Sequence, residues 1–156
     1  MISMIASVGK NRELGKNNDL IWHFKQDMKF FKETTMGHIV VMGYNTYKSL
    51  PGDLPGRHIK VVSSKKLNDV EVYNGIQDLV DEYINSDEEI FICGGARIYS
   101  QFLPYASKLY LTEIDDEDLN ADTFFPAFNK KEWKKEILDK GTTEKFTYKM
   151  CIYVRK

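Results

Sequence analysis

The chain has 156 residues, which is the size of one ordinary domain and enough to bury most of its apolar surface around a single core. Its 22 basic and 23 acidic residues give a formal net charge of -1, and this balance argues against a protein that binds nucleic acid by neutralising many phosphates. The two cysteines, Cys93 and Cys151, have the spacing of neither a metal-ligand pair nor a redox motif, so we expect a reduced, cytoplasmic protein.

Short apolar runs alternate with helix-like stretches over the first two thirds of the chain. Near-continuous apolar runs that end at glycine or serine are typical of strands in a sheet covered on both faces. Their alternation with helices implies a mostly parallel sheet with right-handed crossovers. In chain order we predict a strand at residues 2–8, a helix at 24–35, strands at 39–42 and 59–62, a helix at 76–84, a strand at 90–93 and a helix at 96–103.

The C-terminal third has a different pattern. Residues 108–114, roughly 132–138 and 146–154 show Tyr, Ile and Val in partial alternation, with no convincing helix between them. We therefore predict that this part adds an antiparallel edge to the parallel sheet.

Three of the predicted strands run into turns that contain glycine or serine, at residues 42–46, 62–65 and 93–99. In open α/β sheets, ligands bind beyond the carboxyl ends of the strands, where glycine lets the backbone approach and helix N-termini offer free N–H groups to phosphates. One such turn is usually only a turn, but three together suggest a dinucleotide site. The first turn lacks the Gly-x-Gly-x-x-Gly pattern, which disfavours an ordinary Rossmann site.

Asp27 lies in the first turns of the predicted helix 24–35, one turn from Phe24 and one turn from Phe31. Taken alone, an acid at this position is stabilised by the helix dipole and is commonly solvated, which is the plainer interpretation. The alternative is a carboxylate aimed into an apolar cleft, where it could bind or protonate a cationic heterocycle.

A series of short motifs over roughly residues 1–65 and 90–126 resembles the dihydrofolate reductase family in order and spacing, while the last residues are similar only in strand pattern. The resemblance implies an α/β fold with one domain over residues 1–156, a mixed, mostly parallel sheet of about eight strands with an antiparallel C-terminal edge, and about four flanking helices. The motifs are Ile5-Ala6-Ser7, Leu14-Gly15, Trp22, Asp27 with Phe31, Val41-Met42-Gly43, Thr46, Ser49-Leu50, Leu54-Pro55-Gly56-Arg57, Ser63-Ser64, Gly94-Gly95-Ala96-Arg97-Ile98-Tyr99, Thr112 and Asp122-Thr123-Phe124-Phe125-Pro126.

The resemblance implies the reduction of 7,8-dihydrofolate to tetrahydrofolate, by hydride transfer from NADPH to carbon 6 with protonation of nitrogen 5 from water. Asp27 would pair with the amino-pyrimidine edge of the pteridine, Thr112 would bind that carboxylate, and Trp22 would hold an ordered water. Arg57 would receive the α-carboxylate of the glutamate tail. Without the family, Trp22 reads as core packing, Thr112 as a strand hydroxyl and Arg57 as a surface residue. The walls of the substrate pocket, which antifolate inhibitors would share, are expected from Ile5, Ala6, Leu20, Met28, Phe31, Leu50, Leu54 and Cys93.

The family also implies how NADPH is held. Gly43 to Thr46 and Gly94 to Tyr99 would bind the pyrophosphate, with a cis peptide between Gly94 and Gly95. Residues 9–23 resemble a mobile loop that closes over the nicotinamide and is latched by Asp122 and Thr123; opening of such a lid often limits turnover. The expected cofactor contacts are Ala6, Ser7, Leu14, Gly15, Asn18, Leu20, Gly43, Tyr44, Asn45, Thr46, Ser49, Val62, Ser63, Ser64, Lys65, Cys93, Gly94, Gly95, Ala96, Arg97, Ile98, Tyr99 and Thr123.

Two positions depart from the family pattern. Ile21 stands where proline usually precedes the lid tryptophan, and loss of the proline restriction on φ predicts a lid that is freer in its open states. Tyr44 stands where arginine commonly faces the 2′-phosphate of the cofactor. We still expect NADPH rather than NADH, held by Ser63, Ser64 and Lys65, with a weaker preference than usual.

Two other functions remain open from the sequence: another pterin or flavin-precursor reductase on the same fold, and a non-catalytic module that binds folate or a nucleotide. The acidic run from Glu113 to Asp122 fails as a calcium loop because Ala121 and Ala127 occupy the glycine and glutamate positions. The three histidines are too scattered for a metal site. No apolar run approaches the roughly 20 residues of a membrane helix, and no signal peptide is recognisable. We expect a monomer.

Overall fold

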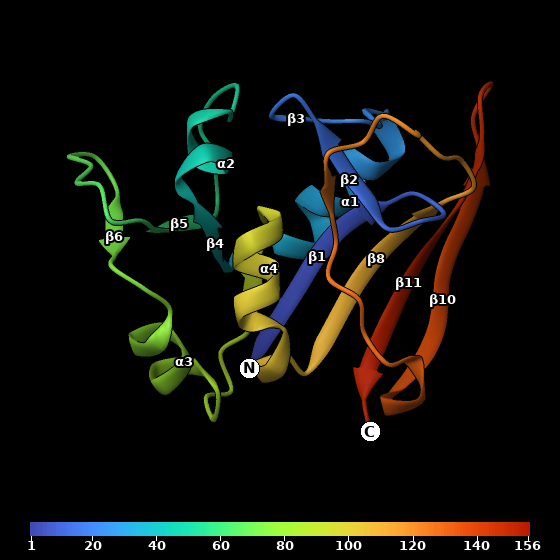
Figure 1. Ribbon diagram of the computed structural model, residues 1–156. Coiled ribbons are helices and arrows are strands. Elements are labelled where there is room, and N and C mark those ends of the chain that lie inside the picture. Colours follow the sequence, from blue (N-terminus) through green and yellow to red (C-terminus); the bar gives the residue numbers. More distant parts are fainter.

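The computed structural model describes residues 1–156 and is built on one eight-stranded sheet (Figure 1). The strand order is β10-β11-β8-β1-β7-β4-β5-β6, so the first strand of the chain lies inside the sheet. The elements in chain order are β1 (Ile2–Val8), β2 (Glu13–Lys16), β3 (Asp19–Leu20), α1 (Lys25–Thr35), β4 (Ile39–Gly43), α2 (Tyr44–Lys48), β5 (His58–Val62), β6 (Glu71–Tyr73), α3 (Gln77–Tyr83), β7 (Ile90–Ile92), α4 (Ala96–Phe102), β8 (Lys108–Ile114), β9 (Thr123–Phe124), β10 (Trp133–Thr142) and β11 (Thr147–Arg155), with 3-10 turns at Leu103–Tyr105 and Lys130–Glu132.

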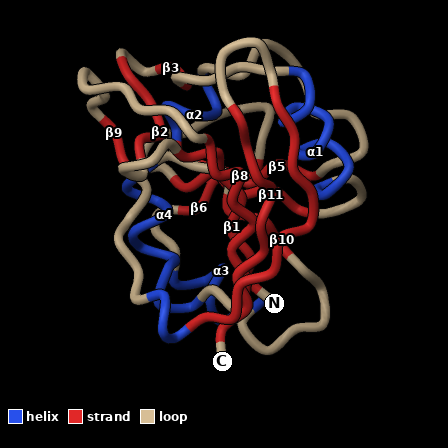
Figure 2. Tube along the Cα trace, turned by 90° about the vertical axis from the view of Figure 1, so that its right-hand side faces the viewer, coloured by secondary structure: helices blue, strands red, loops and turns tan.

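The sheet is covered on both faces, as its apolar strands predict. Figure 2 shows α1 on one side of the sheet and α3 and α4 on the other. Along β4, Val40 and Met42 pack in the cluster that includes Phe31 of α1, whereas Ile39 and Val41 pack with the side chains of α3 and α4. Successive strand residues point to opposite faces, so two cores form, one on each side of the sheet.

The antiparallel edge is confirmed, with one difference in where it begins. β8 pairs in parallel with β1 and antiparallel with β11, so the antiparallel edge consists of β11 and β10. The 3-10 turn at Leu103–Tyr105, with its proline, ends α4 at the same end of the sheet at which β1 starts, so β8 can return in the direction of β1.

A second, three-stranded sheet of order β3-β2-β9 lies within residues that the sequence analysis treats as loops. Asn17 and Asn18 join β2 to β3 with φ values of 53° and 62°. Asparagine tolerates this left-handed region, and a tight turn with positive φ at both central residues suits a two-residue hairpin. The expected mobile loop at residues 9–23 is therefore a hairpin that pairs with β9.

The described helices are short, and α1 is the longest with 11 residues. None of them is long and apolar enough to cross a membrane. α2 and β6 are additional elements that the sequence analysis does not predict.

Candidate active site

Asp27 lies at the carboxyl ends of β1 and β8, where two hydroxyl groups hold its carboxylate. Thr112 Oγ1 donates to Asp27 Oδ1 at 2.7 Å, and Ser7 Oγ donates to Asp27 Oδ2. Ser7 and Thr112 are partners in the β1–β8 register, so the sheet sets the spacing of the two donors. Asp27 is half-buried and oriented, and of the two interpretations of its sequence position the structure favours a carboxylate aimed at the sheet over a solvated acid.

An apolar cluster lies on the same face of the sheet as Ser7, the residue that donates to Asp27. Ile5 of β1 is 6% exposed, and Phe31, Leu50, Leu54 and Cys93 pack half-buried against the same cluster. Burial raises the pKa of the Cys93 thiol, so this cysteine is a neutral wall residue rather than a nucleophile.

Two predicted wall residues differ from this pattern. Met28 is 66% exposed and Leu20, on the lid hairpin, is 54% exposed. α1 packs on the sheet through Phe30, Phe31 and Thr35, which leaves Met28 at the edge of the apolar stripe rather than within it. Both side chains are therefore open to solvent.

Arg57 stands beside this apolar cluster. Its guanidinium carbon lies 6.0 Å from the centre of the Phe31 ring, and its Nε donates to the Pro55 carbonyl oxygen at 3.2 Å. The terminal nitrogens make no ion pair with an acidic residue of the chain. The geometry leaves a guanidinium fork free for a carboxylate.

The glycine turns after β4 and β7 meet at one point. The Gly43 N–H donates to the Gly94 carbonyl oxygen at 2.9 Å, and the Gly94–Gly95 peptide is cis, as expected. A Cβ at Gly94, where φ is +127°, would lie 3.3 Å from Thr46 Oγ1. α2 and α4 begin directly after Gly43 and Gly95, which carry no side chain to cap the first N–H groups. These N–H groups and the absence of Cβ atoms fit a pyrophosphate.

Tyr44, the first residue of α2, has two lysines close to its ring. Lys65 Nζ is 4.2 Å from the centre of the Tyr44 ring, and Lys48 Nζ is 5.7 Å from it. The cation–π geometry places two ammonium groups at the position from which the usual arginine is missing. The sequence analysis names Lys65 but not Lys48, which looks like any exposed lysine at a helix end.

The lid hairpin is tied to the segment that follows β8. The Asn17 N–H donates to Asp122 Oδ2 at 2.9 Å, and the Asp122 N–H donates to the Gly15 carbonyl oxygen at 3.0 Å. Within the lid, the Ile21 N–H donates to the Leu14 carbonyl oxygen at 3.4 Å, a contact that proline could not make. This contact offsets part of the freedom that the missing proline predicts.

Trp22 and Glu13 make further hydrogen bonds between the lid and the segment that follows β8. The Trp22 indole N–H donates to Asp116 Oδ2 at 3.0 Å, and this hydrogen bond lowers the pKa of Asp116. The single ring donor is thus engaged with Asp116, and the water-holding role expected for Trp22 stays a prediction. Glu13 is 1% exposed and accepts the N–H groups of Asn11 at 2.7 Å and Asp118 at 2.9 Å. The sequence analysis misses Glu13, because a buried acid in a polar loop carries no periodic signal.

Comparisons with known proteins decide the family. The model of the family described as dihydrofolate reductase matches residues 1–155. The chain belongs to the dihydrofolate reductase family. This confirms the resemblance, and the eight-stranded mixed sheet with four α-helices confirms the expected fold.

Relatives in the dihydrofolate reductase family cover nearly the whole chain. The dihydrofolate reductase of Bacillus subtilis (strain 168) is 36% identical over 162 residues, covering 100% of this chain and 95% of the relative. That of Staphylococcus haemolyticus is 36% identical over 160 residues, covering 99% of this chain and 95% of the relative. A solved structure of the dihydrofolate reductase from Enterococcus faecalis, complexed with NADP(H) and RAB-propyl, has a TM-score of 0.88 at 26% identity and covers 100% of this chain and 96% of that chain.

The dihydrofolate reductase motif after β7 is only partly exposed. Tyr99 donates its hydroxyl to the Ile5 carbonyl oxygen at 2.6 Å, and burial raises the pKa of Tyr99 well above its ordinary value. Ile98 and Val62 are also buried, whereas Arg97 is exposed. Tyr99 and Ile98 thus act first as packing that supports the glycine turn, and the backbone of this turn is the surface left for a ligand.

Proposed function

We propose that this protein reduces 7,8-dihydrofolate to tetrahydrofolate, with NADPH as the hydride donor and Asp27 as the residue that holds the pteridine. The single observation that carries the assignment of roles is the Asp27 carboxylate, which two hydroxyl groups hold beside an apolar cluster. Membership of the dihydrofolate reductase family supports the reaction, and it disfavours the other reductases and the non-catalytic module that the sequence leaves open.

Asp27 fixes the heterocycle by a charge-assisted pair. A carboxylate accepts hydrogen bonds from an amino group and a ring N–H in one plane, and such ionised pairs are stronger than neutral ones. Ser7 and Thr112 both donate to Asp27, so they fix its rotation while leaving its outer lone pairs for the ligand. Asp27 stabilises the ring protonated at nitrogen 5, with the proton drawn from water.

The other substrate contacts follow from the walls of the cleft. Ile5, Phe31, Leu50 and Leu54 exclude water from the ring, and the free fork of Arg57 binds the α-carboxylate of the glutamate tail. An apolar cleft with one carboxylate also suits antifolate inhibitors that carry an amino-pyrimidine ring. We expect these to compete with dihydrofolate.

NADPH supplies the hydride when it is bound. The N–H groups at the starts of α2 and α4 hold its pyrophosphate, and the lid hairpin covers its nicotinamide side with Leu14, Gly15, Asn18 and Leu20. Ser63, Ser64 and Lys65 bind the 2′-phosphate, with Tyr44 as a support for Lys65. Orientation of the two rings with water excluded is the main contribution of the protein.

We propose further that the protein works as a single domain over residues 1–156, as a monomer in the cytoplasm and without nucleic acid. Apart from the adjacent Ile137 and Leu138 of β10, its large exposed apolar side chains lie in different parts of the chain, which favours a monomer. Sedimentation at micromolar concentration tests this part, and a stable dimer would contradict it.

The test of function is the loss of NADPH absorbance when NADPH and dihydrofolate are mixed with the protein. Asp27→Asn is expected to slow the hydride-transfer step about 100-fold or more at neutral pH, because the amide cannot stabilise the protonated ring. Asp69→Asn, at an exposed loop position, is the matched control. NADPH affinity should stay the same in both variants. Near-normal turnover of Asp27→Asn would contradict the role proposed for Asp27.

A further inference from the structure

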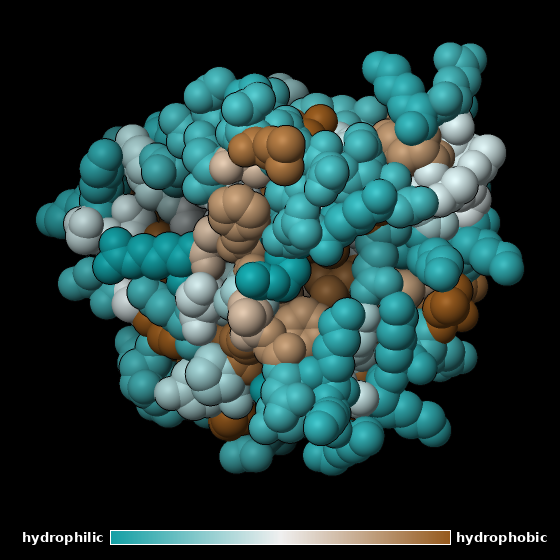
Figure 3. Space-filling view, turned by 45° about the vertical axis from the view of Figure 1, so that its right-hand side comes forward, coloured by the Kyte–Doolittle hydropathy of each residue, from teal (hydrophilic) through white to brown (hydrophobic).

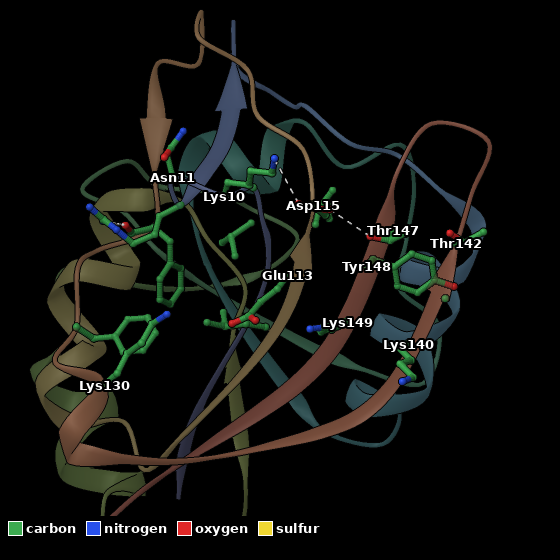
Figure 4. Close-up of a pocket in the computed structure, with 18 of the residues that line it drawn as sticks. Lys10, Asn11, Glu113, Asp115, Lys130, Lys140, Thr142, Thr147, Tyr148 and Lys149 are labelled. Carbon is green, nitrogen blue, oxygen red and sulfur yellow. Dashed lines mark hydrogen bonds and ion pairs between the residues drawn. The ribbon is translucent and has the colours of Figure 1, made fainter.

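A second hollow lies on the other side of the sheet from Asp27. It has a volume of about 1100 Å³ and is bounded by residues 8–12, by the segment 125–130 and by the β10–β11 hairpin. Apolar atoms gather in a hollow in the middle of the face shown in Figure 3, and hydrophilic side chains surround them. Figure 4 shows the hollow itself, with side chains from β8, β10 and β11 on its wall.

The sheet separates this hollow from the active site. On β8, Thr112 points to Asp27, while its neighbours Leu111 and Glu113 line the hollow. On β1, Ser7 points to Asp27 and Val8 lines the hollow. A ligand can therefore occupy the hollow while the Asp27 site is filled.

The two acidic groups in the hollow are already paired. Glu113 Oε1 lies 2.7 Å from Lys135 Nζ, and its other oxygen accepts the Tyr153 hydroxyl. Asp115 Oδ1 lies 3.4 Å from Lys10 Nζ. Burial disfavours the charged form of Glu113, but the hydrogen bonds from Lys135 and Tyr153 outweigh this and hold its pKa below the ordinary value.

Four further cations in the wall make no ion pair with any acidic residue: Arg12, Lys130, Lys140 and Lys149. Arg12 donates to the Phe125 carbonyl oxygen, whereas the three lysines have no partner of this kind. Lys149 is the register partner of Glu113 on one side and of Lys140 on the other, so the three side chains form one row across β8, β11 and β10. Like charges directly opposite each other destabilise a strand pair. An anion between the two ammonium groups would remove this repulsion.

The floor of the hollow is apolar. Phe125 is fully buried, Leu111 is 2% exposed, and Phe128 stands edge-on to Phe125 with ring centroids 6.1 Å apart. In Figure 4 the ends of Lys130 and Lys149 lie on opposite sides of Glu113, so the cations flank the floor rather than cover it. This combination recognises an apolar body with negative groups at its edges.

We propose that this hollow is a binding site for a small organic dianion with an aromatic body, distinct from the substrate and cofactor sites. The anionic groups of the ligand lie against Lys149, Lys140 and Lys130, and its ring lies on Phe128. Because residues 9–12 form part of the wall, the occupant also touches the base of the lid.

The experiment uses naphthalene disulfonate as the probe and the protein saturated with NADP⁺ and folate, so that the Asp27 cleft is filled. Amide NMR shifts are followed during the titration. The expected result is saturable binding at one site, with the largest shifts at Gly141 and Lys149, and an affinity that falls with added salt. Lys149→Ala and Lys140→Ala should each weaken binding about fivefold, the loss of one exposed ion pair.

Lys145→Ala is the matched control, because Lys145 is an exposed lysine of the same hairpin that does not line the hollow. Lys149 and Lys140 are also exposed, so their loss is expected to leave the amide spectrum of the free protein otherwise unchanged. The proposal is overturned by an absence of saturable binding, by equal affinities of the three variants, or by equally tight binding of a neutral naphthalene diol.

Discussion

Ser7 and Thr112 are cross-strand partners in β1 and β8, and their two hydroxyl groups hold the two carboxylate oxygens of Asp27. The register of two central strands thus decides where the one carboxylate of the cleft points. A slip of one residue in either strand would turn the hydroxyl of that strand to the opposite face. Orientation of Asp27 is therefore a property of the sheet and not of α1 alone.

Removal of one of these hydroxyls tests this dependence. Thr112→Val keeps the shape of the side chain but removes the 2.7 Å donor to Asp27. We expect kcat/KM for dihydrofolate to fall about tenfold, the value of one hydrogen bond to a charged group, with no change in the affinity for NADPH. Thr142→Val, at an exposed position of β10, is the control. Equal kcat/KM values for the two variants would contradict the positioning role of Thr112.

The contact between the lid and Asp122 gives a second prediction. Asp122→Ala removes the acceptor that lies 2.9 Å from the Asn17 N–H, so the lid hairpin loses a hydrogen bond to the segment that follows β8. We expect hydride transfer in a single turnover to slow about fivefold. Asp69→Ala, far from the lid in sequence and exposed, should keep the wild-type rate. An unchanged rate in Asp122→Ala would mean that the hairpin closes without this latch.

Much of the fold is predictable because a strand that is buried on both faces of a sheet gives a continuous apolar run in the sequence. Val40, Val41 and Met42 are all buried, and a short apolar run that ends at a glycine suits a strand covered on both sides. The glycine turns are predictable because a Cβ at Gly43 would lie 3.0 Å from Ile98 Cγ1, and because Gly94 has a φ of +127°, which favours glycine. Local chemistry dictates these features.

The remaining features depend on contacts between distant segments. The hydrogen-bond partner of Trp22 is Asp116, 94 positions away, and no sequence motif near either residue predicts this pair. Buried Glu13 looks like an ordinary polar loop residue, and its backbone donors come partly from Asp118. The small sheet pairs Glu13 of β2 with Phe124 of β9, far apart in the sequence. Its strands are too short for a periodic pattern to show in the sequence. A sequence pattern predicts which residues of one helix or strand are buried. It does not predict which loops will contact each other.

Glu113 makes stability depend on pH. Its pKa in the folded protein lies below the ordinary value of 4.5, so its contribution to stability is fully present above that pH and is lost as the pH falls through the folded pKa. Glu113→Gln should therefore lower the free energy of unfolding by on the order of 1 kcal/mol at neutral pH. This difference from wild type should shrink on acidification below 4.5.

Urea denaturation at a series of pH values measures this effect. Glu144→Gln, at an exposed position in the β10–β11 turn, is the control and should follow the wild-type curve throughout. A destabilisation of Glu113→Gln that stays constant down to the acid limit would show that the charge of Glu113 is not its source.

We expect the pair of Tyr44 and Lys65 to set the choice of cofactor. Lys65 Nζ stands 4.2 Å from the centre of the Tyr44 ring, which holds its charge at the edge where the 2′-phosphate of NADPH would lie. Lys65→Ala should lower the ratio of kcat/KM for NADPH to that for NADH about fivefold, because one exposed charge pair is lost. Tyr44→Leu should lower the ratio in the same direction but less, since the charge remains and only its support is removed. Lys66→Ala, the exposed neighbour, is the control. Equal efficiency with both cofactors in the wild-type protein would contradict the assignment.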